Sequence, residues 1–278
     1  MDKKEVLEKI ATRLRIHSIK ATSKAGSGHP TTCMSAAELI ACLFFDEMTY
    51  NIKEPHDWAN DEFVLSKGHA APILWACYAE AGILPLKNLM NLRKITSTLE
   101  GHPTPRMKWV KSATGSLGQG LSVGVGLALA LKLGKSKRRA YVLMGDGECA
   151  EGAVWEAANL ASHLKCDNLC VLVDINRLGQ SQETMFEHDI KSYEKRFKAF
   201  GWDVFKVDGH RIDEILSALD SARKSDKPTA ILAKTLKGKG VSFLEDKNGW
   251  HGKPLKDEDL KNALDEIGPM PEIDAKQY

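Results

Sequence analysis

The chain has 278 residues, of which 43% are hydrophobic and 27% are charged. This composition is typical of a soluble globular protein and excludes a disordered or fibrous chain. The formal net charge is only +2, so no strong field exists that would attract nucleic acid or an anionic membrane, and we expect neither as a partner. The run of basic residues at 135–139 is interpreted as a solvated turn.

The N-terminal segment, 1–26, carries charges throughout and lacks the apolar block of a secretory signal, so we expect a cytoplasmic protein. The most apolar stretch, 121–133, is too short to span a bilayer and contains Gly124 and Gly126. We therefore expect it to form a buried core helix. The six cysteines form no Cys-x-x-Cys pair, which predicts free thiols and neither a zinc knuckle nor a disulfide framework.

Two helices are expected first along the chain, at 6–19 and 34–47, and apolar residues recur at a helical period in the first of them. Beyond them, short apolar runs alternate with longer helical patterns. Runs of this kind are typical of parallel strands that are buried on both faces. The expected strands are 62–65, 140–144, 169–173, 204–207 and 230–233. The expected helices among them are 70–81, 118–133, 152–164, 189–200 and 212–223.

This alternation predicts an α/β fold, a three-layer αβα arrangement with a mostly parallel central sheet. No repeat or linker interrupts the pattern, so we expect one domain over residues 1–278. Its tail, from residue 256, is expected to form a short helix followed by a Pro-containing extension.

One motif stands at the ends of two successive strands. Gly145-Asp146-Gly147 follows the second expected strand, and Asn176 follows the third. Both side chains should therefore reach the carboxyl edge of the sheet, where open α/β folds bind ligands. Magnesium prefers oxygen ligands and takes several of them from phosphates and water. The glycines and the N-terminus of the next helix would let a diphosphate approach the backbone.

Two other interpretations of these glycines fail on spacing. The dinucleotide fingerprint Gly-x-Gly-x-x-Gly requires a glycine at position 150, but the next glycine is Gly152. A phosphate-binding P-loop ending at Gly134-Lys135-Ser136 would require a glycine where Leu129 stands. A nucleotide-binding α/β protein therefore remains a distant alternative.

Several further segments accompany this motif, and together they cover essentially the whole chain. In this order they resemble the N-terminal, thiamine diphosphate-binding domain of transketolase, with residues 174–181 (DINRLGQS) most similar to the animal type. The segments are SGHP at 27–30, LSKGHA at 65–70, EGHP at 100–103, ATGSLGQG at 113–120 and WHGKPL at 250–255.

The resemblance implies a ligand set for each part of the cofactor. The metal, Mg²⁺ with Ca²⁺ or Mn²⁺ as expected substitutes, would be held by Asp146, Asn176 and the carbonyl of Leu178. Residues around the motif and in three other segments would face the diphosphate: Lys67, His69, Gly145, Gly147, Gln180 and Lys237. Gly115 and Leu117 would support the two rings of the cofactor.

The resemblance implies that four of the nine histidines, each beside a glycine, line a sugar channel and act in catalysis: His29, His69, His102 and His251. Histidine can give and take a proton near neutral pH, which suits chemistry on sugar hydroxyls. Glu151 and Glu156 would lie near the cofactor at a subunit interface, although Glu151 is also explained by the dipole at a helix start. The other five histidines are interpreted as structural or surface residues.

The resemblance implies a transferase that moves a two-carbon ketol unit from a ketose phosphate to an aldose phosphate, through an enamine of thiamine diphosphate. In the family, a second domain supplies the glutamate that activates the cofactor and the arginines that bind the sugar phosphate. We therefore expect a split transketolase of the pentose phosphate pathway: this chain is one subunit, and a C-terminal subunit with the pyrimidine-binding domain completes an α2β2 hetero-oligomer.

Other functions within this cofactor class stay open at this point. A synthase that condenses pyruvate with a sugar phosphate, and the α subunit of a 2-oxo acid dehydrogenase, are disfavoured by His251 and by the segment at 101–103. An enzyme acting on an unusual ketose phosphate remains possible. So does a non-catalytic partner that kept the fold, although such a protein would be expected to lose Asp146 or Asn176.

Overall fold

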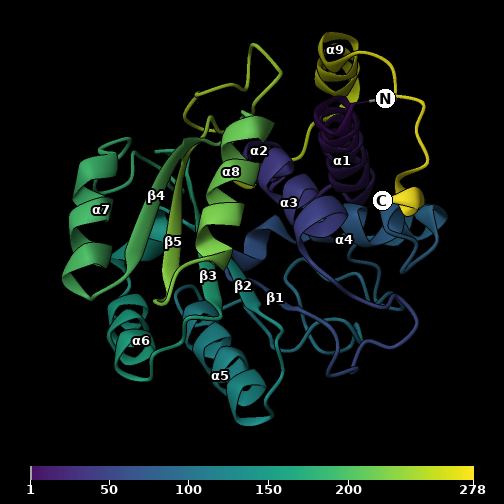
Figure 1. Ribbon diagram of the computed structural model, residues 1–278. Helices are drawn as coiled ribbons and strands as arrows, with labels where there is room; N and C mark the ends of the chain where they lie inside the picture. The colour runs from purple at the N-terminus through teal and green to yellow at the C-terminus, as the bar shows by residue number, and fades with distance from the viewer. Residues whose placement is uncertain (1) are drawn as a thin grey trace.

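A sheet of five parallel strands forms the centre of the computed structural model, which describes residues 2–278. The strand order is β1-β2-β3-β5-β4 (Figure 1). All five strands predicted from the sequence are present within two residues of the expected ends, and all are parallel. They are β1 (Glu62–Leu65), β2 (Ala140–Gly145), β3 (Leu169–Ile175), β4 (Asp203–Asp208) and β5 (Thr229–Lys234).

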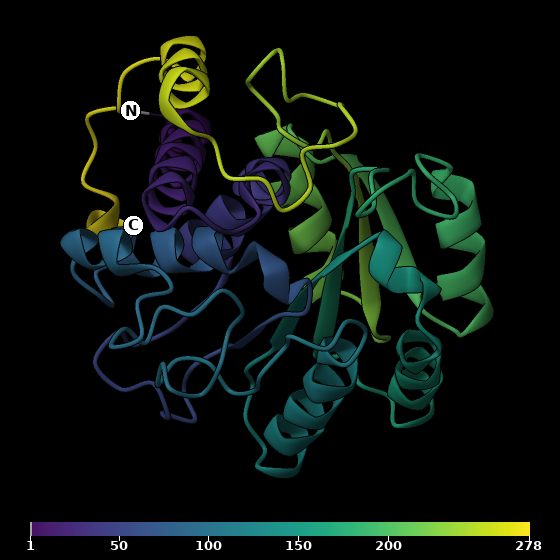
Figure 2. The same ribbon diagram turned by 180° about the vertical axis from the view of Figure 1, so that it is seen from behind.

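Helices cover both faces of this sheet, which confirms the three-layer arrangement (Figures 1 and 2). Successive residues of the central strands face opposite layers, as a pleated strand requires: Leu143 packs into one core and Val142 into the other. The first layer contains α1 (Lys3–Ala25), α3 (Ala37–Cys42), α4 (Ala71–Glu80) and α8 (Ile212–Arg223). The second contains α5 (Gly120–Leu133), α6 (Gly152–His163) and α7 (Ile190–Ala199).

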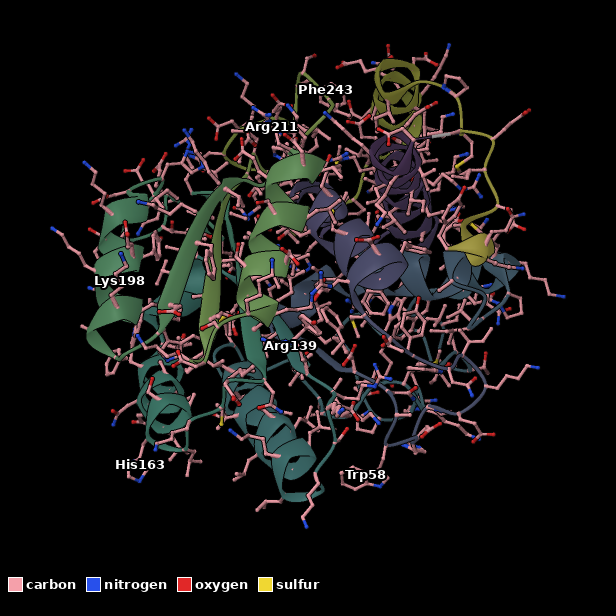
Figure 3. The ribbon with its side chains drawn as sticks, viewed as in Figure 1. Trp58, Arg139, His163, Lys198, Arg211 and Phe243 are labelled. Carbon is pink, nitrogen blue, oxygen red and sulfur yellow. The ribbon has the colours of Figure 1, made fainter. Side chains whose placement is uncertain are left out.

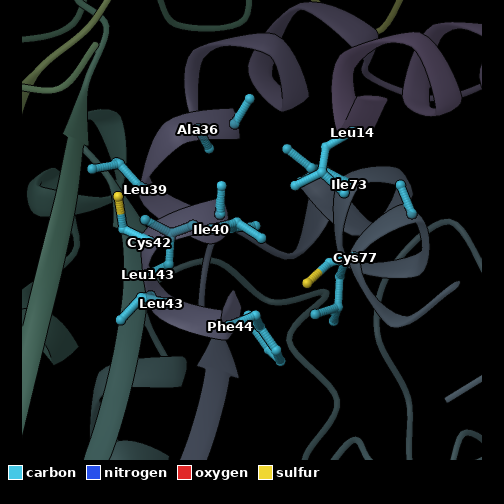
Figure 4. Packing of buried hydrophobic residues seen from close by; sticks show 14 of the residues in the cluster. Leu14, Ala36, Leu39, Ile40, Cys42, Leu43, Phe44, Ile73, Cys77 and Leu143 are labelled. Atoms are coloured by element: carbon cyan, nitrogen blue, oxygen red, sulfur yellow. The ribbon is translucent and has the colours of Figure 1, made fainter. Parts of the chain in front are cut away.

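The larger core lies where α1, α3 and α4 meet the sheet (Figure 4). Leu14, Ile40 and Ile73 are fully buried there, and Leu143 of β2 closes the cluster from the sheet side. Among the described residues, all six cysteines are buried and unpaired, as the sequence predicted.

The prediction of one continuous helix at 34–47 is wrong. The chain instead forms α2 (Pro30–Ser35), breaks at Ala36, and continues as α3 and a π-helical turn, Leu43–Glu47. Pro30 is well placed in a first helical turn because its missing N–H needs no partner there. The hydroxyl of Ser35 donates to the carboxylate of Asp174 on β3 at 2.6 Å. This long-range contact at the break overrides the continuous local pattern.

The tail forms α9 (Asp257–Ile267), which lies beside α1 in Figure 1 and is followed by an extension, as expected. The predicted apolar helix forms as α5 and packs closely against β2. A Cβ added at Gly124 would overlap the side chain of Val142. In residues 2–278 we find no helix with the length and apolarity that crossing a membrane requires.

Candidate active site at the carboxyl edge of the sheet

A cavity of about 760 Å³ opens where four strands end. Lys67 follows β1, Asp146 follows β2, Asn176 follows β3 and Lys237 follows β5, and all four residues line the cavity. Parallel strands bring their carboxyl ends to one edge, so residues from distant parts of the chain converge there. The cavity therefore lies where the sequence predicted a ligand site.

The carboxylate of Asp146 is buried at the base of this cavity. Its Oδ2 accepts hydrogen bonds from the backbone N–H of Arg177 and the hydroxyl of Thr184, each at 2.8 Å. Burial raises its pKa to about 6, and the nearby carboxylate of Asp174 adds to the effect. Both hydrogen-bond donors are neutral, so the ionised carboxylate has no basic side chain in direct contact. Its negative charge is therefore available to bind a cation.

Two further oxygens border the same space. The amide of Asn176 is held by its Nδ2, which donates to Asp174 at 3.3 Å, and by its Oδ1, which accepts from the backbone of Leu178 at 3.3 Å. The carbonyl of Leu178 accepts from the ammonium of Lys237 at 2.7 Å. A carboxylate, a carboxamide and a carbonyl are hard oxygen ligands of the kind that Mg²⁺ selects.

These oxygens fit a metal that shares its coordination with a phosphate. Within residues 2–278, no group of three or more His, Cys, Asp or Glu side chains could hold a metal ion. A Mg²⁺ ion bound to Asp146, Asn176 and Leu178 would therefore complete its octahedral shell from phosphate oxygens and water, as Mg²⁺ usually does.

Four histidines line the same cavity, and their rings lie close together. The ring of His29 is 5.1 Å from that of His69, 4.8 Å from that of His251 and 6.5 Å from that of His102, centroid to centroid. The fold thus brings together the four histidines that the sequence singled out. Each is half-buried and faces the cavity.

The cluster holds these imidazoles neutral at physiological pH. Burial, with the charges of His102 and Lys237, lowers the pKa of His29 to about 4. Burial and the charge of Lys237 likewise lower the pKa of His251 to about 3, and that of His69 falls well below its usual value. The pKa of His102 is lowered by burial and by Arg93. Neutral rings can both donate and accept hydrogen bonds toward sugar hydroxyls.

A family model described as "Transketolase, thiamine diphosphate binding domain" matches residues 6–275. The chain belongs to the transketolase family. It is 53% identical over 266 residues to a transketolase of Pongo abelii, and 52% identical over 266 residues to one of Homo sapiens. Each match covers 95% of this chain and 42% of the relative, so the chain spans less than half the length of these relatives.

Solved transketolases share the fold. The transketolase from Campylobacter jejuni matches with a TM-score of 0.89 at 34% identity, over 96% of this chain and 43% of that chain. The transketolase from Leishmania mexicana gives a TM-score of 0.89 at 31% identity, over 98% of this chain and 43% of that one. The chain thus carries a transketolase-type thiamine diphosphate-binding domain, as the resemblance implied.

The lysines of this transketolase domain differ in a way that the sequence did not predict. Lys67 was expected to compensate diphosphate charge, but its ammonium forms a buried ion pair with Asp174 and also donates to the carbonyl of Thr32 at 3.2 Å. Lys237 contacts neutral acceptors instead: Leu178, Gly179 and Nδ1 of His251, the last at 2.8 Å. Lys237 is therefore the lysine whose charge is available to a ligand.

The remaining predicted residues divide into two groups. Gly115, Leu117, Gly145, Gly147 and Gln180 all line the cavity. A Cβ at Gly115 or Gly145 would approach no atom closer than 3.8 Å, so the packing of the chain itself does not require glycine there, whereas a closely bound ligand would.

Glu151 and Glu156 form the second group, because their side chains are exposed and do not line the cavity. The backbone of Glu151 forms the N-cap position of α6. The fold does not bring these two acids together with the other predicted residues, so their cofactor role stays a prediction that the cavity does not support.

Sequence reasoning missed four residues that shape the site. Glu148 is buried and accepts from Gly118 and Gly145, each at 3.1 Å, and from the hydroxyl of Ser66. It thereby joins three loops of the cavity wall. Its place directly after Gly147 was a usable signal. Asp174, Thr32 and Thr184 had none, because their roles depend on contacts between distant segments.

Proposed function

We propose that this chain binds thiamine diphosphate together with Mg²⁺ in the cavity at the carboxyl edge of the sheet. The observation that carries the proposal is the convergence of three hard oxygens, one uncompensated lysine and four neutral histidines on a single cavity. When bound, thiamine diphosphate supplies a thiazolium carbon that can act as a nucleophile toward a ketose carbonyl. The protein must supply binding, orientation and proton transfer.

Each wall of the cavity has its own task in this proposal. Asp146, Asn176 and the carbonyl of Leu178 would hold Mg²⁺, and the ammonium of Lys237 would turn from Leu178 toward the diphosphate. Ammonium–phosphate contacts are charge-assisted and stronger than the contact to a neutral carbonyl that they replace. A tightly bound diphosphate would therefore recruit Lys237 at little cost.

The histidine wall would face the sugar. Because the imidazoles are neutral, each has one ring nitrogen that can donate a hydrogen bond and one that can accept a proton from a substrate hydroxyl where no other donor occupies it. In His251 the proton would lie on Nε2, since Nδ1 accepts from Lys237 at 2.8 Å. His251 and His29 would thus present their rings to a substrate carbonyl or hydroxyl.

We further propose that the chain is one subunit of a transketolase that moves a two-carbon ketol unit between sugar phosphates in the pentose phosphate pathway. A C-terminal partner subunit would carry the pyrimidine-binding domain in an α2β2 assembly. The relatives are more than twice as long as the matched region. The six buried, unpaired cysteines support a cytoplasmic location.

Exposed apolar side chains on α5 and α6 support a partner as well. Leu133 at the end of α5 is 75% exposed, and Leu160 on α6 is 47% exposed. Gly126 also faces outward from α5, and a Cβ there would meet nothing within 4 Å. Glycine in an exposed helix costs about 1 kcal/mol relative to alanine. If another chain approached α5 closely at this position, the absence of a side chain at Gly126 would be explained.

Calorimetric titration with thiamine diphosphate and Mg²⁺ tests the cofactor proposal. We expect Asp146→Asn to weaken binding at least tenfold. Asp226→Asn changes an exposed aspartate far from the cavity and should leave the affinity unchanged. Equal affinity in the two variants would place the metal elsewhere. A ketol-transfer assay with and without the co-purified partner tests the subunit proposal, and full turnover by the single chain would contradict it.

A further inference from the structure

A second cavity, of about 520 Å³, lies at the amino edge of the sheet, opposite the candidate active site. Arg139 and Asn168 directly precede β2 and β3 and line it. Figure 3 shows Arg139 near the lower end of α8, far from the upper edge at which the strands end. We name this space the basic cavity, because six cationic residues line it: Lys132, Lys135, Lys137, Arg138, Arg139 and Arg223.

The positive charge of the basic cavity is only partly compensated. Lys132 pairs with Asp167 at 2.8 Å, and Arg223 pairs with Glu47 at 2.6 Å. In the part of the chain that the structure describes, the side chains of Lys135, Lys137 and Arg138 make no hydrogen bond or ion pair. Among the same residues, the side chain of Arg139 donates only to a neutral carbonyl. Four positive charges therefore remain around one concave surface.

Helix ends reduce this excess without cancelling it. α5 and α8 both end at the cavity, and a helix C-terminus carries roughly half a negative charge. Two such ends subtract about one elementary charge from the four unpaired cations. The guanidinium of Arg139 contacts the C-terminal end of α8, because its Nη2 donates to the carbonyl of Ala222 at 3.1 Å. The cavity thus keeps a net positive potential.

Arg139 also has an unused donor. Its Nε is buried and has no hydrogen-bond partner among residues 2–278. A buried donor without a partner costs about 1–3 kcal/mol, and a shift of the guanidinium toward an anion in the cavity would remove that cost. All ten residues that line the cavity are polar or charged. Recognition there would consequently rest on charge and hydrogen bonds and not on an apolar ring.

We propose that the basic cavity is a second anion site, which binds a small, multiply charged anion of the phosphate or diphosphate class. Lys137 and Arg138 supply the mobile charges, and Arg139 supplies a donor fixed by its bond to α8. The run at 135–139 is then a ligand-binding turn, in place of the solvated turn expected from the sequence. This site is independent of the cofactor cavity and of its proposed chemistry.

Inorganic pyrophosphate is the probe that tests the site, with EDTA present so that no metal contributes. Each lysine is followed by acetylation and mass spectrometry with and without pyrophosphate, because this readout separates the two cavities. We expect Lys135 and Lys137 to be protected at least threefold. Unchanged acetylation of Lys135 and Lys137 in the presence of pyrophosphate would overturn the proposal.

Calorimetry on matched variants completes the test. Lys137→Gln/Arg138→Gln should weaken pyrophosphate binding at least tenfold. Lys87→Gln/Lys191→Gln removes the same charge from exposed, unpaired lysines elsewhere and should leave the affinity unchanged. Equal losses in both double variants would show a nonspecific charge effect and contradict a site. Should the first variant unfold, Lys137→Gln alone, which changes an exposed side chain, gives the same comparison with a threefold expected loss.

Discussion

The ammonium of Lys67 and the carboxylate of Asp174 form an ion pair from which water is excluded, with side chains 1% and 0% exposed. Asp174 also accepts from Ser35, Thr235 and Asn176. Its donors come from α2 and from the segments that follow β1, β3 and β5. One carboxylate therefore ties together most of the segments that supply the cavity.

Asp174→Asn should destabilise the chain strongly, because it leaves Lys67 buried without a counter-charge. Breaking a buried pair from one side costs about 3–5 kcal/mol. Burial alone would raise the pKa of Asp174, but the charge and hydrogen bond of Lys67, with the hydrogen bonds of Ser35 and Thr235, outweigh it and the pKa is lowered. Urea unfolding measures the effect. Asp203→Asn, which breaks the exposed pair with Lys227, should cost at most about 1 kcal/mol; similar losses in both variants would contradict the role of burial.

Lys237→Met should separate cofactor binding from stability. Burial, with the charge of Lys67, lowers the pKa of Lys237 to about 8, so its ammonium adds little to the stability of the unliganded chain. Loss of a charge-assisted hydrogen bond, about 1.5–3 kcal/mol, should weaken thiamine diphosphate binding about 10- to 100-fold. Calorimetry checks the affinity, with Lys239→Met as the neighbouring control. Unchanged affinity would remove Lys237 from the diphosphate site.

The carboxylate of Glu38 should make stability sensitive to acid. Burial opposes its ionisation, but Arg15 and His210 outweigh burial and lower its pKa to about 2. A carboxyl with a depressed folded pKa stabilises fully above its unfolded value of 4.5, and this contribution of about 3 kcal/mol is lost as the pH falls from 4.5 to 2.

Urea unfolding between pH 6 and pH 2.5 tests this, because the difference between the native protein and Glu38→Gln should shrink over that window. Exposed Glu156→Gln should show no such change. A difference independent of pH would contradict the assignment. Glu38 also supports the site indirectly. Its carboxylate contacts Nδ1 of His210 at 3.1 Å, and Nε2 of His210 accepts from the backbone N–H of Leu236 at 2.9 Å. His210 thereby stabilises the loop that carries Lys237.

Two glycines of α5 should respond in opposite ways. Gly126→Ala adds a Cβ to open space and should stabilise the isolated chain by about 1 kcal/mol. Gly124→Ala forces a Cβ into Val142 and should destabilise it by about 1–3 kcal/mol. Thermal unfolding gives both values. If α5 meets the partner subunit, Gly126→Leu should also lower the yield of co-purified partner; an unchanged yield would place the interface elsewhere.

The sequence by itself determined the strands, because fully buried parallel strands require uninterrupted apolar runs, and it located the site, because Asp146 and Asn176 stand directly after two of them. It also identified the four histidines that the fold brings together. These features are local patterns, readable without knowledge of distant residues.

Only the tertiary structure decided how charge is distributed. Lys67 and Asp174 are far apart in the sequence, so nothing local indicated that one lysine is compensated and Lys237 is not. The same holds for the break at Ala36 and for the basic cavity around Arg138, where two strand starts and two helix ends converge. Ion pairing and burial depend on which segments meet, and that is a property of the fold and not of any single stretch of sequence.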